Sequence, residues 1–231
     1  MNQMSRREQN RLDKQSRIMG AALKVFAKAG FSGASMDMIA AEAELSKPTL
    51  YNHFSSKEVL FQNMMAVQRD GIMLGFNAAP DKGLVAQLLA FAWSYSNTVM
   101  NPEFLSLARL IIGEAQRFPN VGRDYLQSGP DHVLSGLMAF LGIQRDLGRL
   151  TFEDAELAAE DFWGLILSAP RTRALHVPDE DFSAEVLARY IHNGIRTFLR
   201  AYSTETVGDL ARLEAAIKTI RVEVEQAKLT K

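Results

Sequence analysis

The sequence predicts an all-α protein in which a small three-helix head precedes a larger helical body. Apolar residues recur every three or four positions over most of the 231 residues, which is the spacing of one helix face. Ser or Thr precedes several of these segments as an N-cap, and Pro or Gly separates them. No pair of alternating strands joined by a tight-turn signal is found. We therefore expect helices throughout.

The head is organised around the stretch from residue 45 to residue 60. Ser46 is a good N-cap and Pro48 suits a first helical turn, so a short helix is expected from about residue 47 to residue 53. Leu50 lies on its buried face, whereas its other faces are rich in hydrogen-bond donors. A helix of two turns is marginal alone, so it needs partner helices.

Two preceding helices supply these partners. The first is expected from about residue 13 and ends at Gly30, while residues 1–12 are expected to be mobile. Ser35 caps the second, whose inner face is rich in Ala and allows close packing. Three helices of which the third presents donors form a helix-turn-helix arrangement.

Residues 15–61 resemble the DNA-binding domain of the tetracycline-repressor (TetR/AcrR) family. The resemblance rests on Ala22, Phe26, Gly30-Phe31, Ser35-Met36-Asp37-Met38-Ile39-Ala40, Ala43, Leu45-Ser46-Lys47-Pro48-Thr49-Leu50-Tyr51-Asn52-His53-Phe54 and Lys57-Glu58-Val59-Leu60. One departure is Glu44, because this turn often carries Gly in the family. A non-Gly residue is expected to be tolerated there at modest cost.

The resemblance implies that double-stranded operator DNA is the partner of this head. Lys47 can bind guanine and Asn52 can bind adenine, whereas Tyr51, His53 and Lys57 are expected to hold phosphate oxygens. The alternative is a merely solvated helix face. The predicted DNA-binding residues are Arg17, Ser35, Met36, Ser46, Lys47, Pro48, Thr49, Tyr51, Asn52, His53 and Lys57.

Composition bounds the class of protein. The net charge is −1, but residues 1–60 hold nine Lys and Arg against six Asp and Glu, so the head carries +3 and the remainder −4. A basic end on an acidic body suits a protein that touches phosphate at one end. There is no cysteine, no secretory signal and no apolar run of membrane-spanning length, so a cytoplasmic protein without membrane contact is expected.

The body, like the head, is predicted to consist of helices, and its architecture resembles the sensing and dimerising domain of the same family. We expect a head domain of residues 1–60 and an effector-binding and dimerisation domain of residues 61–231. The body's helices are expected at about 56–77, 84–100, 103–118, 120–143 with a break or kink at Gly129-Pro130, 151–168, 183–202 and 206–228, with loops at 79–83 and 169–181.

Two functional sites are expected in the body. A small apolar or amphipathic effector is expected to contact aromatic and charged residues, although core packing is the alternative role for each aromatic. These residues are Phe91, Trp93, Tyr95, Arg109, Glu114 and Phe118. A homodimer interface of two helices from each subunit is expected at Ala158, Phe162, Gly164, Tyr190, Gly194 and Phe198, with packing inside one subunit as the alternative.

The last helix carries an apolar seam with a period of 3.5 residues. Its members are Leu210, Leu213, Ile217, Ile220 and Val224. Two heptads are too short for an independent coiled coil. The seam is therefore expected to pack on the body of its own subunit or across the dimer.

Together these patterns predict a ligand-responsive DNA-binding transcriptional regulator that acts as a repressor. A ligand-independent or architectural regulator is the first alternative. An enzyme is a remote one, because the four His residues lack ligand spacing and no nucleotide-binding or nucleophile motif is present. No metal, cofactor or catalytic residue is expected.

Overall fold

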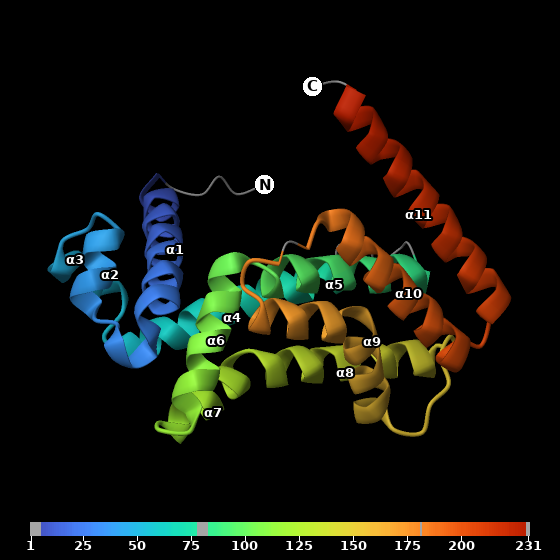
Figure 1. Ribbon diagram of the computed structural model, residues 1–231, viewed down its shortest axis with the longest axis horizontal. Helices are drawn as coiled ribbons and strands as arrows, with labels where there is room; N and C mark the ends of the chain where they lie inside the picture. Colours follow the sequence, from blue (N-terminus) through green and yellow to red (C-terminus); the bar gives the residue numbers. More distant parts are fainter. Residues whose placement is uncertain (1–5, 78–82, 181, 230–231) are drawn as a thin grey trace. The chain divides into compact units, whose positions relative to one another are not determined.

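The computed structural model describes residues 6–77, 83–180 and 182–229, with side chains for residues 9–75, 83–180 and 182–219. Its regular elements are all helices, which confirms the predicted class, and one antiparallel bridge pairs Leu150 with Ser203. The helices, labelled in Figure 1, are α1 (Arg6–Gly33), α2 (Met36–Glu42), α3 (Lys47–His53), α4 (Lys57–Asn77), α5 (Gly83–Val99), α6 (Pro102–Ala115), α7 (Pro119–Ser128), α8 (Pro130–Asp146), α9 (Ala155–His176), α10 (Ala184–Tyr202) and α11 (Thr206–Leu229).

Internal contacts divide the chain into two units. Unit 1 holds the residues up to Arg69 together with Met100–Asp131, and unit 2 holds Asp70–Val99 together with the residues from His132 onward. Helix α4 therefore contributes to both units. Helices α6 and α7 belong to the unit of the head, because α6 packs along α1, whereas sequence reasoning assigned them to the body.

An aromatic cluster forms the centre of the head. The rings of Phe26, Phe31 and Phe61 lie 5.2–5.7 Å apart in stacked and edge-on pairs, a geometry that aromatic quadrupoles favour. Leu50 of α3 is fully buried in the same unit. Burial of that one side chain holds the short polar helix in the head. This packing is needed because a helix of two turns is not stable alone.

Gly30 interrupts α1 as predicted. Its φ of 72° and ψ of 171° lie outside the helical region, where Gly avoids the steric penalty of a side chain. The chain then makes one more turn, to Gly33, before α2. The expectation for the other end of α1 was wrong in part, because residues 6–12 continue the helix where a mobile segment was predicted.

The packing of α9 on α10 dominates unit 2, and a glycine makes it possible. A β-carbon placed on Gly194 would lie only 2.6 Å from the carbonyl oxygen of Leu165, so the two helices approach more closely than any larger residue permits. The rings of Phe162 and Phe198, 5.0 Å apart, fill the space beside this contact. The two helices therefore form the core of this unit.

The predicted loop from residue 169 to residue 181 is wrong over its first half. Helix α9 runs through Pro170 and ends at His176. Proline removes one backbone hydrogen bond from a helix, but here Ile166, Pro170 and Ala174 lie on one buried face. The burial of that face outweighs the local propensity of proline to end the helix.

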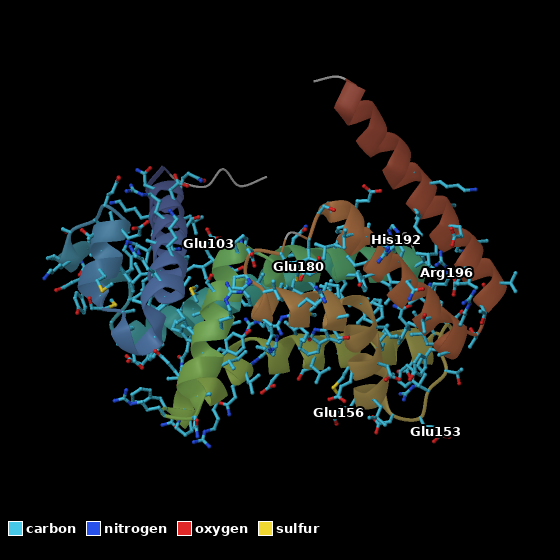
Figure 2. The ribbon with its side chains drawn as sticks, in the orientation of Figure 1. Glu103, Glu153, Glu156, Glu180, His192 and Arg196 are labelled. Carbon is cyan, nitrogen blue, oxygen red and sulfur yellow. The ribbon has the colours of Figure 1, made fainter. Side chains whose placement is uncertain are left out.

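Helix α11 packs its first half on α5 and α10 of its own unit. Leu213 is fully buried and Ile217 is 5% exposed, and Arg196 of α10 binds Glu214 across the contact. Figure 2 labels His192 and Arg196 on α10, on the side where α11 packs. The expected packing within the subunit is thus observed for this half, while the side chains of Ile220 and Val224 lie outside the described residues. Figure 1 shows α11 continuing beyond α10.

Candidate nucleic-acid interface

Two serine caps position the helices of the helix-turn-helix. Ser35 accepts a hydrogen bond from the backbone N–H of Met38, and Ser46 accepts one from Thr49. These caps start α2 and α3 where the sequence placed them. The Met36 side chain is buried in the head, so only its backbone remains available for DNA.

The outer face of α3 carries the side chains predicted to contact bases and phosphates. Tyr51 is half exposed, Lys47 and Asn52 are exposed, and Thr49 and His53 are half-buried. The Pro48 ring, also exposed, occupies the first turn. These side chains extend from one helix whose opposite face is fixed in the core, so the donors are presented by a rigid support.

The ammonium of Lys47 forms an ion pair with Asp37 of α2 at 2.6 Å. Both side chains are more than half exposed, so this pair contributes little to stability. The pair connects the first residue of α3 to the first turn of α2. Sequence reasoning did not predict this pairing, because it joins residues ten positions apart in two helices.

Glu44 adopts the left-handed backbone conformation that the turn requires, with φ of 54°. Arg17 donates to the carbonyl oxygen of Ala43 at 2.7 Å and lies 3.5 Å from the Glu44 carboxylate. The acid that replaces the usual Gly thus faces an arginine of α1. Arg17 was predicted to contact DNA, and in the structure its hydrogen bond to Ala43 connects α1 to the end of α2.

Lys57 has a structural role that sequence reasoning missed. Its ammonium donates to the carbonyl oxygens of Phe31 at 2.7 Å and Ala34 at 3.1 Å, and it lies 4.6 Å from the centroid of the Phe31 ring. These contacts join the start of α4 to the end of α1. Phosphate binding by Lys57 stays a prediction, and it would compete with these internal bonds.

The residues predicted to contact an effector are divided between the two units. Phe91, Trp93 and Tyr95 belong to unit 2, whereas Arg109, Glu114 and Phe118 belong to unit 1. Of the first three, Phe91 and Tyr95 are buried and stack 6.0 Å apart, and Trp93 is half-buried against His192. Each therefore has a packing role, which was the alternative considered.

The three predicted residues in unit 1 have separate environments. Phe118 is 40% exposed and lies under the guanidinium of Arg117. Glu114 accepts a hydrogen bond from Ser32 and its carboxylate lies beside Gly30. Arg109 donates to Ser106, one turn earlier on α6. Glu114 therefore contacts the end of α1, which the sequence did not indicate.

One buried polar group in unit 2 was not predicted. Ser96 of α5 is fully buried, and its hydroxyl has no hydrogen-bond partner among the described residues. An unmet buried hydroxyl is unfavourable, so it marks a position where a bound molecule or water can supply the missing bond. A lone serine in an apolar helix carries no distinctive sequence signal.

Most of the predicted dimer residues belong to the core of one subunit. Ala158, Phe162, Gly194 and Phe198 are buried there by α9, α10 and their neighbours, which is the alternative considered for these residues. Periodicity marked them as apolar but could not tell which apolar face turns inward. Gly164 is exposed and Tyr190 is half-buried.

The described residues contain no group of three or more His, Asp or Glu side chains able to hold a metal ion. Within the same residues, no helix combines the length and the apolar character needed to cross a lipid bilayer. A helix-turn-helix whose third helix exposes a polar face is the arrangement by which DNA-binding regulators enter the major groove.

Comparisons with known proteins identify the family. A family profile described as bacterial regulatory proteins, tetR family, matches residues 18–64, and one described as the AefR-like transcriptional repressor C-terminal domain matches residues 86–204, more than half of the chain. The chain belongs to the TetR family of bacterial transcriptional regulators. Helix α11 lies beyond both matched segments.

Relatives and solved structures agree with this assignment. The transcriptional repressor NicS of Pseudomonas putida is 34% identical over 100 residues, 39% of this chain and 44% of NicS. The activator FasR of Mycolicibacterium smegmatis is 40% identical over 76 residues, 32% of this chain and 35% of FasR. The matches thus span less than half of these curated relatives.

The structural matches are longer. A crystal structure described as a TetR-family regulator from Mesorhizobium loti has a TM-score of 0.69 and 28% identity, covering 84% of this chain and 98% of that one. The flavonoid-responsive regulator FrrA has a TM-score of 0.62 and 30% identity, with the same two coverages.

Proposed function

We propose that this protein is a homodimeric repressor that binds operator DNA through α3 and leaves it when a small apolar or amphipathic effector binds. The observation that carries the DNA-binding part is the exposed face of α3, where Lys47, Tyr51 and Asn52 extend from a helix anchored by buried Leu50. Lysine and asparagine there have the donors needed for base edges, and tyrosine has a hydroxyl for phosphate.

DNA selection from genomic fragments, followed by affinity measurements, tests this interface. Tyr51→Phe is expected to weaken binding to all sequences, whereas Lys47→Ala is expected to relax the preference at particular bases by about 1–3 kcal/mol per contact. Arg123→Ala is the control, because that exposed arginine of α7 pairs only locally with Asn120. Normal operator binding by a Lys47→Ala/Tyr51→Phe double variant would contradict the proposal.

An effector site in unit 2 is supported by Ser96. Its unpaired buried hydroxyl lies on α5, the helix that also carries Phe91 and Tyr95. The name of the similar regulator FrrA says that it responds to flavonoids, which supports a small-molecule effector for this chain. Both tryptophans, Trp93 and Trp163, belong to this unit, so their fluorescence can report binding.

The effector proposal is tested by releasing operator-bound protein with fractions of a cell extract. Ser96→Ala removes only an unpaired hydroxyl, so folding stability is expected to be unchanged or higher, and a weaker response then reports a lost contact with the effector. If no fraction released the protein from its operator and tryptophan fluorescence stayed unchanged, the alternative of a ligand-independent regulator would be favoured. The aromatic packing around Phe91 is the observation that supports this alternative.

Helix α4 is proposed as the connection between effector and DNA, because it contributes residues to both units. Effector binding would favour an arrangement of the two heads that no longer matches successive major grooves, about 34–36 Å apart. Such a shift requires only that the effector bind the released arrangement more tightly.

The dimer is proposed to form through the outer faces of α9 and α10. Leu157 is 59% exposed and Leu165 is 37% exposed on α9, where Gly164 and Ser168 are also exposed. Exposed leucines beside small residues permit close packing of a partner helix. Leu157→Arg/Leu165→Arg is expected to give a monomer in sedimentation experiments, and an unchanged dimer would exclude this face.

A further inference from the structure

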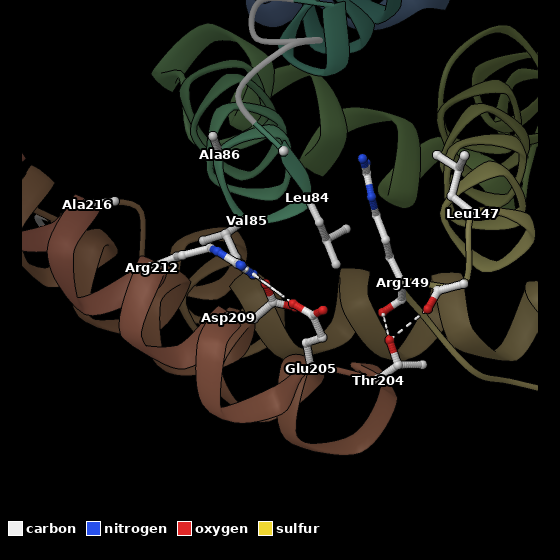
Figure 3. A pocket seen from close by; sticks show the side chains of 12 residues that line it. Leu84, Val85, Ala86, Leu147, Arg149, Thr204, Glu205, Asp209, Arg212 and Ala216 are labelled. Atoms are coloured by element: carbon white, nitrogen blue, oxygen red, sulfur yellow. Dashed lines mark hydrogen bonds and ion pairs between the residues drawn. The ribbon is translucent and has the colours of Figure 1, made fainter.

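Unit 2 contains a pocket of about 710 Å³ beside α11. Three segments far apart in the sequence line it, namely the first turn of α5, the turn after α8 and the start of α11 (Figure 3). None of the residues predicted to contact an effector lines this pocket. Its volume lies within the roughly 300–1,000 Å³ typical of small-molecule sites.

Backbone and side-chain bonds fix the walls of this pocket in place. The hydroxyl of Thr204 donates to the carbonyl oxygens of Gly148 at 2.7 Å and Arg149 at 3.1 Å, and the Thr204 N–H donates to Arg149 as well. The adjacent bridge between Leu150 and Ser203 continues the same contact. The turn after α8 is therefore attached to the turn before α11, so the pocket is preformed.

Charges in this pocket are separated between its two sides. On α11, Arg212 donates to Asp209 at 2.6 Å and approaches Glu205 at 3.4 Å. Asp209 is 5% exposed and also accepts from Ser203. One guanidinium thus serves two carboxylates, which leaves this cluster with a net charge of −1.

Arg149 carries the opposite charge on another wall. Its Nη1 donates to Gln144 at 2.9 Å, and among the described residues no carboxylate pairs with it. Figure 3 shows its side chain extending between Leu84 and Leu147, away from the cluster on α11. The first turn of α5, which also lines the pocket, contains no acidic side chain, so nothing on that wall repels an anion.

We propose that this pocket binds a small zwitterion, with its carboxylate at Arg149 and its ammonium at Glu205. Arginine suits a carboxylate because its planar fork of donors matches two oxygens. Glu205 is exposed and its contact with Arg212 is long, so it can accept from a ligand. The apolar side chains of Leu84 and Val85 also line the pocket and accommodate a short alkyl chain.

This site is independent of the effector and DNA sites proposed above. Part of its wall comes from α11, which lies outside the matched family segments, and occupancy would join α11 to α5. A ligand that binds only the folded state stabilises it by mass action. Binding is therefore expected to raise the melting temperature of the full chain.

Three matched probes of one chain length test the proposal by calorimetry on the full-length protein. 6-Aminohexanoate carries both charges, hexanoate lacks the ammonium and hexylamine lacks the carboxylate. The first is expected to bind at least about tenfold more tightly than either of the others, because each lost charged contact weakens binding by this order. Equal affinity for all three probes, or binding of none of them, would overturn the proposal.

Substitutions in the pocket test which residue binds the carboxylate of the ligand and which binds its ammonium. Arg149→Gln is expected to abolish the preference for 6-aminohexanoate over hexylamine, whereas Arg149→Lys should retain part of that preference. Glu205→Gln is expected to abolish the preference for 6-aminohexanoate over hexanoate. The control Arg145→Gln alters a nearby arginine that pairs with exposed Asp146 and does not line the pocket, so both preferences should survive. Wild-type selectivity in folded Arg149→Gln protein, verified by its circular dichroism, would refute the proposal.

Discussion

Lys57 binds Phe31 twice, through the carbonyl oxygen at 2.7 Å and through the ring face at 4.6 Å. Together with its bond to Ala34, this contact fixes the start of α4 to the end of α1. The start of α4 is therefore bonded to the helix on which α2 packs. The relationship leads to the first prediction.

Lys57→Met is expected to destabilise the head by about 1–3 kcal/mol, because two carbonyl oxygens lose a charged donor while the alkyl packing is kept. Chemical denaturation followed by circular dichroism measures the change. Lys47→Met, which breaks only an exposed ion pair with Asp37, serves as the control and should change stability by less than about 0.5 kcal/mol. Equal effects of the two substitutions would contradict the role given to Lys57.

Gly194→Ala is expected to destabilise unit 2 by about 1–3 kcal/mol, because the new methyl group would lie 2.6 Å from the Leu165 carbonyl oxygen and force α9 and α10 apart. Gly142→Ala in α8 is the matched control, since nothing lies within 4 Å of its added carbon. That substitution should stabilise the helix by about 0.5–1 kcal/mol. If both substitutions moved the melting temperature in the same direction, the close approach of α9 and α10 at Gly194 would be excluded.

Leu213→Ala is expected to cost about 2–5 kcal/mol, because it empties a fully buried position between α11 and the body. Val207→Ala, at the second residue of the same helix and 85% exposed, should have almost no effect. Thermal unfolding at several protein concentrations measures both changes. If Leu213→Ala melted like the wild type, α11 would not be docked on its subunit in solution.

Stability is expected to fall between about pH 10 and pH 12 through Tyr202. A hydrogen bond from its hydroxyl to Asp161, aided by partial burial and the nearby charge, raises the pKa of Tyr202 from 10.0 to about 12. The protonated form is favoured in the folded state, so the contribution is complete below the unfolded pKa and is lost as pH rises through the folded one.

Denaturation at pH 9 and at pH 11.5 measures this alkaline loss, and Tyr202→Phe supplies the comparison. Phenylalanine keeps the ring contact with Phe198, 4.7 Å between centroids, but cannot ionise. The variant should lose less stability than the wild type over this interval. An equal loss in the two proteins would show that the bond to Asp161 is not formed.

Local sequence alone determined the helix-turn-helix and most helix boundaries. Ser35, Ser46 and Gly30 act through bonds and dihedral angles within a few residues of themselves, so their roles can be read from order along the chain. The same holds for the break at Gly129-Pro130, where α7 ends and α8 begins. The exposure of Lys47, Tyr51 and Asn52 followed from helical periodicity once Leu50 was taken as the buried side.

Only the tertiary structure decided which partners distant residues find. Lys57 meets carbonyl groups 23 and 26 positions away, α9 continues through Pro170 because its neighbours bury that face, and Phe162 and Phe198 pack on each other in the core of one subunit. The walls of the pocket beside α11 likewise include segments that are joined by the bonds from Thr204 to the backbone of Gly148 and Arg149. Each outcome depends on burial and geometry summed over several helices, whereas periodicity records only that a face is apolar.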